Sequence, residues 1–170
     1  MKKIAVIALS SFAMSLGGCA TVLNGTHQGY TTDSQPAGAT VTFSDGSTCT
    51  TPCKLELVRK RDLRADIALA GHQPTYVLIQ SKLGGSTFGN ILLGGGIGAV
   101  VDGSNGASNK LVPKPLIVRL APVGSIEGAM LLDEKGNVVR SVREHNDSVR
   151  QDVAKTIGPR LAGLEGTDPQ

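Results

Sequence analysis

Hydrophobic and polar residues alternate with a period of two along several short stretches between residues 30 and 81. This period is typical of β-strands that bury one face, and it is clearest over residues 63–69. One face of that stretch holds Leu63, Ala65, Ile67 and Leu69, and the other holds Arg64, Asp66 and Ala68. Similar strands are predicted at 40–43, 55–57 and 76–79, with turns rich in Gly, Pro and Asp between them. Strands at spacings of about ten residues predict a small antiparallel β-sandwich.

The alternation returns in the last third of the chain. Leu116, Val118 and Leu120 face one way along a predicted strand that begins just after a Pro-Lys-Pro sequence. Because proline cannot donate a ladder hydrogen bond, we expect this strand at the edge of a sheet. Two short hydrophobic stretches on either side of the turn residues 133–137 predict one further hairpin.

A period of about four replaces the period of two near the C-terminus. Val149, Val153 and Ile157 recur at this spacing, which predicts one amphipathic helix. A capping box that begins at Ser148 marks its expected start, and Gly158, which precedes a proline, marks its expected end. The hydrophobic stripe has two interpretations, because it can pack on the protein's own sheet or bind a partner.

The first nineteen residues have the pattern of a bacterial export signal. Two lysines follow Met1, and residues 4–16 form an apolar run too short to span the roughly 30 Å hydrocarbon core as a helix. The run ends in Leu16-Gly17-Gly18-Cys19, which resembles the lipobox of bacterial lipoproteins. The resemblance implies that Cys19 is lipidated and carries three acyl chains, which suffice for stable anchoring. The alternative is an ordinary secretory signal, in which Cys19 is a thiol.

The residue after Cys19 bears on which membrane holds the protein. Ala20 occupies the position at which Asp is the usual inner-membrane retention signal of this class. The resemblance therefore implies an outer-membrane protein, anchored in the inner leaflet and facing the periplasm.

Cys49 and Cys53 remain as a pair in a compartment that oxidises thiols. The simplest interpretation is a disulfide that clips one hairpin, and the alternatives are a redox pair or a metal site. Three residues separate the two cysteines, one more than in thioredoxin-like motifs, and the three histidines are scattered singly. We therefore expect a structural disulfide, no metal and no cofactor.

Residues 28–81 carry several short Gly/Pro motifs in a fixed order. These are Pro36-Ala37-Gly38-Ala39-Thr40-Val41, Asp45-Gly46, Thr51-Pro52, and an alternating strand that ends in Ala70-Gly71-His72 before Pro74. The set resembles the PEGA domain of bacterial envelope proteins, with Ala37 in the place of the Glu for which that family is partly named. The resemblance implies a small antiparallel β-sandwich that serves as an extracytoplasmic module, and it brings no catalytic residues.

Arg59, Lys60 and Arg61 form the strongest local basic cluster, with acidic residues interleaved around them. One interpretation is a solvated hairpin tip. The other is a surface that contacts anionic lipid headgroups or peptidoglycan carboxylates.

Residues 83–106 contain nine glycines. Gly85 with Gly89, and Gly94 with Gly98, are pairs of small residues four apart that allow close helix approach, and the pattern resembles a glycine zipper. Three interpretations remain open. The segment forms a short helix or hairpin packed on the β module, it self-associates or inserts into a membrane, or it is a loop.

The composition of the chain argues against some classes of function, because it lacks the residues that they need. At 170 residues the chain has room for one domain with appendages, and aromatic residues make up 3% with no Trp. A nucleic-acid surface built on stacking aromatics is therefore not expected. The net charge of +3 falls to about +1 once the two lysines of the leader are removed, which weakens the case for a polyanion-binding protein.

The sequence predicts a mainly β protein, a small antiparallel β-sandwich with a glycine-rich short helix or hairpin and one C-terminal amphipathic helix. Its expected parts are a signal peptide (1–18), a lipidated tether (19–27), a PEGA-like domain (28–81), a glycine-rich segment (82–112), additional strands (113–142), a helix (143–162) and a disordered tail (163–170).

No nucleophile elbow, zinc helix, P-loop or Cys-His arrangement is found, so an enzyme is not expected. His145 beside Asp147 is the one adjacent acid–base pair, and it suits the polar start of a helix. The predicted function is a lipid-anchored, non-catalytic binding or scaffold module of the cell envelope, with an envelope protein or peptidoglycan as partner. The alternative is a self-assembling or membrane-perturbing lipoprotein that acts through residues 84–103.

Overall fold

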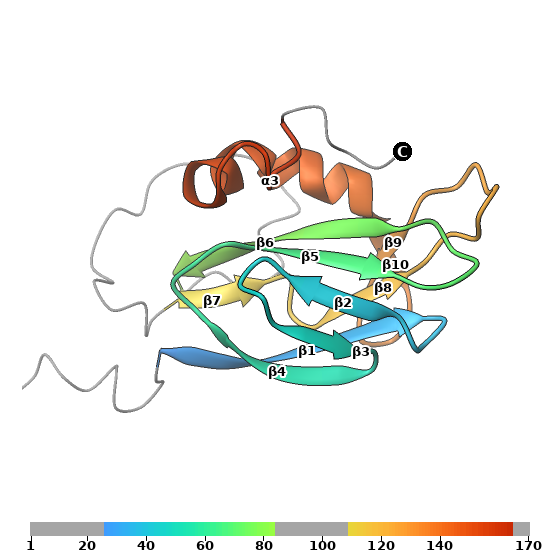
Figure 1. The fold of residues 1–170 in the computed structure, drawn as a ribbon, viewed down its shortest axis with the longest axis horizontal. Helices are drawn as coiled ribbons and strands as arrows, with labels where there is room; N and C mark the ends of the chain where they lie inside the picture. Colours follow the sequence, from blue (N-terminus) through green and yellow to red (C-terminus); the bar gives the residue numbers. More distant parts are fainter. Residues whose placement is uncertain (1–25, 84–108, 165–170) are drawn as a thin grey trace, which may run out of the picture.

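The computed structural model describes residues 26–83 and 109–164 (Figure 1). Ten strands and one helix lie in these two ranges. The predicted leader, the proposed anchor Cys19, the glycine pairs between Gly85 and Gly98, and residues 165–170 lie outside the described residues.

The strands form two sheets of five strands each. The first sheet has the order β10 (Val138–Ser141), β9 (Met130–Leu132), β8 (Leu116–Arg119), β1 (His27–Gln35) and β4 (Cys53–Val58). The second has the order β3 (Thr48–Thr50), β2 (Thr40–Phe43), β5 (Leu63–Ala68), β6 (Thr75–Leu83) and β7 (Asn109–Val112). The predicted mainly β sandwich is confirmed, and only the β1–β8 pair among the described strand pairs is parallel.

The core lies between the two sheets and is built by the predicted alternation. Tyr30 of β1 and Phe43 of β2 meet there edge to face, with ring centroids 6.1 Å apart. Along β5, Leu63, Ala65 and Ile67 are buried in the core as expected. The opposite face of β5 differs from a solvated one, since Arg64 is only 8% exposed. The reason is that the chain after the C-terminal helix covers this face, where the Leu161 carbonyl accepts a hydrogen bond from Arg64.

The strand that follows the Pro-Lys-Pro sequence is not at a sheet edge, and this prediction was wrong. β8 lies between β9 and β1, pairing with β1 from Leu116 to Arg119. Both prolines precede the first paired residue, so neither removes a hydrogen bond from the ladder. The C-terminal third therefore supplies three of the five strands of the first sheet, and residues 28–81 share both sheets with later strands.

The disulfide between Cys49 and Cys53 is present, and its setting differs from a simple hairpin. Cys49 lies in β3 of the second sheet, and Cys53 begins β4 of the first. The bond therefore clips the crossing from one sheet to the other. Thr51, between the two cysteines, is buried and donates its backbone N–H to the Ala39 carbonyl.

The one helix of the described residues, α3 (Val142–Ile157), begins earlier than expected. Its N-cap is Ser141, whose hydroxyl accepts a hydrogen bond from the Glu144 N–H at 3.1 Å. Ser148 instead lies inside the helix and donates its hydroxyl to the His145 carbonyl. A Ser-x-x-Glu capping box thus starts the helix one residue after β10 ends, and the capping box predicted at Ser148 was wrong.

The expected end of α3 is confirmed, and its packing distinguishes between the two interpretations of the hydrophobic stripe. Gly158 is the C-cap, with a φ of 89°, and the chain turns there. Val149 and Val153 are buried against Tyr76 and Leu78 on the outer face of β6, with Ile157 packed beside them. The hydrophobic stripe is therefore used within the protein, and α3 covers the second sheet (Figure 1).

The hairpin predicted around residues 133–137 joins β9 to β10. The Asp133 carboxylate accepts hydrogen bonds from the Lys135 N–H and from the N–H and side-chain amide of Asn137. These bonds hold the pKa of Asp133 below its usual value.

Candidate functional site

The first turns of α3 complete an unpaired edge of β6. Strand β7 pairs with β6 only from Gln80 onward, so the β6 backbone at Tyr76 and Leu78 needs other partners. The Asn146 side chain accepts from the Leu78 N–H at 2.9 Å and donates to the Tyr76 carbonyl at 2.8 Å. His145 Nε2 donates to the Leu78 carbonyl at 2.9 Å. These side chains continue the sheet's hydrogen bonding where no strand does.

His145 has a structural position. It is 8% exposed, and burial lowers its pKa, while the bond to the Leu78 carbonyl acts in the opposite direction. Asp147 lies two positions further along the helix, where side chains do not face each other, and it pairs with Arg150 at 3.0 Å. His145 and Asp147 are thus bonded to different partners and do not pair with each other.

Tyr76 lies between two arginines. The Arg64 guanidinium carbon is 3.8 Å from the ring centroid of Tyr76, and that of Arg150 is 5.9 Å from it. Arg64 also pairs with Asp66 at 2.7 Å. Arg150 donates to the Tyr76 hydroxyl at 2.7 Å and to two carbonyls of the chain after α3. This stacked arrangement fixes α3 and the following turn to the outer face of the second sheet.

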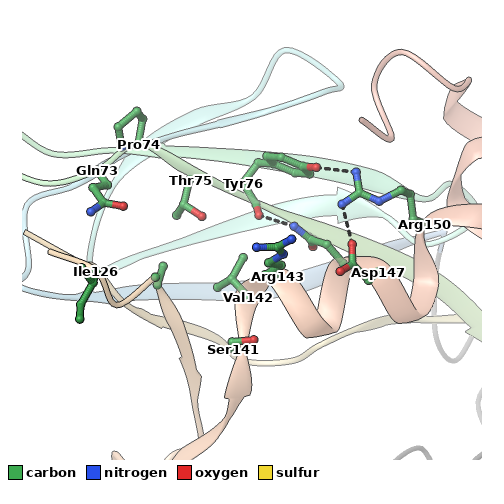
Figure 2. Close-up of a pocket in the computed structure, with 13 residues that line it drawn as sticks. Gln73, Pro74, Thr75, Tyr76, Ile126, Ser141, Val142, Arg143, Asp147 and Arg150 are labelled. Carbon is green, nitrogen blue, oxygen red and sulfur yellow. Dashed lines mark hydrogen bonds and ion pairs between the residues drawn. The ribbon is translucent and has the colours of Figure 1, made fainter. Parts of the chain in front are cut away.

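A cleft of about 560 Å³ opens beside this arrangement, between the start of β6, the start of α3 and the loop before β9. Figure 2 shows Gln73, Pro74, Thr75 and Tyr76 along one wall and residues of α3 along the other. Ile126 lies at the end of the cleft away from Arg150 and is fully exposed at 103%. Val123 of the same loop is 69% exposed. The cleft thus combines an apolar lip with a polar wall.

Most polar side chains of the cleft are bonded to other groups of the protein, whereas Arg143 is exposed to a ligand. Asn146, Asp147 and Arg150 are held by the bonds described above. Arg143 is exposed, and within the described part of the chain it makes no ion pair. Its guanidinium can take a carboxylate or phosphate with two parallel hydrogen bonds. The arrangement suits binding of an acidic group next to an apolar contact at Ile126.

The basic residues Arg59, Lys60 and Arg61 do not act as one cluster. Arg59 donates its Nε to the His27 carbonyl at 2.7 Å and its Nη1 to the Asn109 carbonyl at 3.4 Å. Lys60 and Arg61 line a second cleft of about 540 Å³ with Asp45 and Asp62, against the end of α3. The three side chains therefore separate to two sides of the loop, and a purely solvated tip does not describe Arg59.

Sequence patterns gave a partial signal for the cleft. The buried face of α3 runs from Val142 through His145, Asn146 and Val149 to Val153, so its stripe includes two polar residues. Polar residues at buried stripe positions indicate side chains that form buried hydrogen bonds, so the sequence carries a signal for His145 and Asn146. The roles of Tyr76 and Arg143 depend on contacts between distant segments, which no local pattern reveals.

Within residues 26–83 and 109–164, no three His, Cys, Asp or Glu side chains gather as metal ligands. No helix in these ranges is both long and apolar enough to cross a bilayer. Comparisons with protein-family models, curated proteins and solved structures found no match. The resemblance to the PEGA domain therefore stays a prediction.

Proposed function

We propose that this protein is a lipid-anchored, non-catalytic binding module of the bacterial cell envelope, held at the outer membrane through Cys19. The Leu16-Gly17-Gly18-Cys19 sequence supports the anchor, and Ala20 supports the outer membrane. The Cys49–Cys53 disulfide agrees with an oxidising compartment such as the periplasm.

The observation that carries the proposal is the position of the cleft. The chain enters the sandwich at the start of β1, on the side where β6 ends (Figure 1), and the Thr26 carbonyl there accepts a hydrogen bond from the Arg59 N–H. The cleft lies at Thr75, at the start of β6. Eight residue steps of about 3.3 Å place the two ends roughly 26 Å apart. An anchored molecule would thus carry its cleft away from the anchor, with Ile126 exposed to a partner.

A non-catalytic role is supported by how the titratable groups near the cleft are used. The His145 imidazole donates to a backbone carbonyl and is buried, so it is not directed at a substrate. Asp147 is paired with Arg150. The proposed partner is an acidic, partly apolar segment of an envelope protein or the carboxylates of peptidoglycan. Binding of either one does not require His145 or Asp147 to change protonation.

Mass spectrometry of the mature protein tests the anchor, and photo-crosslinking in cells tests the cleft. We expect Cys19 at the N-terminus with three acyl chains. A photo-crosslinking amino acid in place of Ile126 should capture one dominant envelope component. Arg143→Glu should reduce this capture at least tenfold, and Lys135→Glu, which changes an exposed cation outside the cleft, should leave it unchanged. Equal capture in both variants would contradict binding at the cleft.

The alternative function is self-assembly or membrane perturbation through residues 84–103. One observation favours it, because Leu83 and Asn109 pair across β6 and β7. The segment's two ends therefore leave the sandwich together, and Arg59 links Asn109 to the point where the chain enters. Deletion of residues 84–103 should abolish oligomers and vesicle leakage if this alternative holds. A monomeric wild-type protein that leaves vesicles intact would exclude it.

A further inference from the structure

Four cations from separate parts of the sequence gather around the first half of β1, on the side of the sandwich where the chain enters. They are Lys54 of β4, Arg59 of the following loop, Lys110 of β7 and Lys114 between β7 and β8, and we call them the basic end. Arg59 donates to the carbonyls of His27 and of Asn109, the neighbour of Lys110, and Tyr30 donates to the carbonyl of Pro113, the neighbour of Lys114. The charges of Lys54, Arg59 and Lys110 all act on Lys114. Glu56 is the one acid that the same set of interactions includes.

The cations of the basic end repel one another, so keeping them together costs free energy. The pKa of Lys114 is lowered first by burial, then by the charges of Arg59 and Lys54, with Lys110 adding to the effect and Glu56 opposing it. The structure nevertheless fixes Arg59 and Lys54 in place. Arg59 is tied by two backbone carbonyls, and the side chain of Lys54 lies over Gly29, where a Cβ would come within 2.7 Å of its Cε.

The basic end also lies next to the predicted anchor. Arg59 binds the carbonyl of His27, the first residue of β1. Seven residue steps separate Cys19 from Thr26, and a fully extended chain covers at most about 3.6 Å per residue, or roughly 25 Å. A protein acylated at Cys19 therefore keeps its basic end within this reach of the bilayer, where anionic headgroups attract cations.

We infer that the basic end docks on anionic phospholipid headgroups of the membrane that holds the anchor, which orients the molecule with its cleft away from the bilayer. This inference rests on the proposed anchoring at Cys19. Lipid is favoured over peptidoglycan as the occupant because the short tether brings this end to the bilayer, whereas the cleft lies at the far end of β6.

The test uses acylated protein from cell membranes, with Cys19 acylation first confirmed by mass spectrometry. The protein is reconstituted into vesicles of phosphatidylcholine alone, or of equal parts phosphatidylcholine and phosphatidylglycerol, containing headgroup spin labels. A fluorophore at Thr31→Cys, opposite Lys54 in the β1–β4 ladder, reports the basic end, and one at Ile126→Cys reports the cleft. We expect phosphatidylglycerol to increase quenching at position 31 only, and salt to reverse the increase.

Charge reversal identifies the residues responsible. Lys110→Glu with Lys114→Glu removes two attractions of about 1 kcal/mol each, so the ratio of docked to undocked molecules should fall about thirtyfold. Lys135→Glu with Arg119→Glu, two exposed cations outside both the basic end and the cleft, has the same change in net charge and should leave quenching at position 31 intact. Equal quenching in both vesicle types, or an equal loss in both variants, would overturn the inference. Binding of the basic end to purified peptidoglycan without lipid-dependent quenching would also overturn it. Absence of acylation would instead refute the proposed function.

Discussion

The two ends of the sandwich use charge in opposite ways. Near the cleft, Arg64 pairs with Asp66 and stacks on the Tyr76 ring, and Arg150 pairs with Asp147 and donates to the Tyr76 hydroxyl. At the basic end, three cations and one acid, Glu56, act on Lys114. Paired charges that also bond to the backbone hold the fold together. Cations gathered without matching acids contribute little to stability, and their arrangement is better explained by an anionic surface outside the protein.

The ends also differ in how β6 is secured. Near the cleft, Asn146 and His145 supply side-chain partners to its backbone. At the other end, Asp62 accepts from the Ser81 N–H at 2.6 Å. The comparison indicates that α3 substitutes for a strand at one end and that loop side chains do so at the other.

The largest effect is expected from Asn146→Ala. The substitution leaves the Leu78 N–H and the Tyr76 carbonyl buried without partners, which should cost about 3 kcal/mol of unfolding free energy. Urea denaturation followed by circular dichroism measures this loss. Ser148→Ala, on the exposed side of the same helix, is the matched control and should cost less than about 0.5 kcal/mol. Similar losses in the two variants would contradict the role of Asn146 at the sheet edge.

Removal of the disulfide should have the next largest effect. Cys49→Ser with Cys53→Ser releases a five-residue loop, and the loop-length relation gives a loss of about 2 kcal/mol. Comparison of oxidised and reduced wild-type protein in urea gives an independent value. If reduction left the unfolding midpoint unchanged, the bond would not constrain the crossing between the sheets.

A smaller effect should locate the start of α3. Ser141→Ala removes the N-cap hydrogen bond to Glu144 and should destabilise the protein by about 1 kcal/mol. Ser141→Asp keeps a capping oxygen and should restore most of this stability. A loss in Ser148→Ala larger than that in Ser141→Ala would place the helix start where the sequence had suggested.

The smallest effect concerns pH. Burial lowers the folded-state pKa of His145, so the unfolded chain binds a proton more readily below its ordinary pKa of about 6.5. Stability should therefore fall as pH decreases from 7 through this value and level off below the folded-state pKa. The Asp133 and Asp152 carboxylates, whose pKa values are lowered, titrate in a more acidic range. His145→Gln should remove the dependence between pH 5 and 7, and its persistence there would assign it to another group.

Local patterns predicted much of the fold and little of the cleft. The alternation at Leu63, Ala65 and Ile67 and the stop at Gly158 depend on neighbours in sequence, and both are confirmed. The place of β8 between β9 and β1 depends on pairing over more than eighty residues, which a proline rule cannot determine. The capping box at Ser141 lies eight residues before the start of the apolar repeat at Val149, so that repeat does not mark where the helix begins.

The basic residues also show that local sequence does not determine which side chains meet in the fold. Arg59, Lys60 and Arg61 are consecutive, yet the fold turns Arg59 toward His27 and places the other two beside Asp45. Conversely, Lys54 and Lys114 are sixty residues apart and act on each other. Charge clusters are thus properties of the folded surface, and a run of like charges in sequence identifies only part of one.

The two ends of the sandwich are proposed to face different surroundings, and paired photo-crosslinking in living cells distinguishes these surroundings. Crosslinking amino acids are placed at Thr31 or at Ile126 in the acylated protein, and the captured material is identified by mass spectrometry. The account predicts phospholipid from position 31 and one envelope protein or peptidoglycan fragment from position 126. The same captured material from both positions would contradict it.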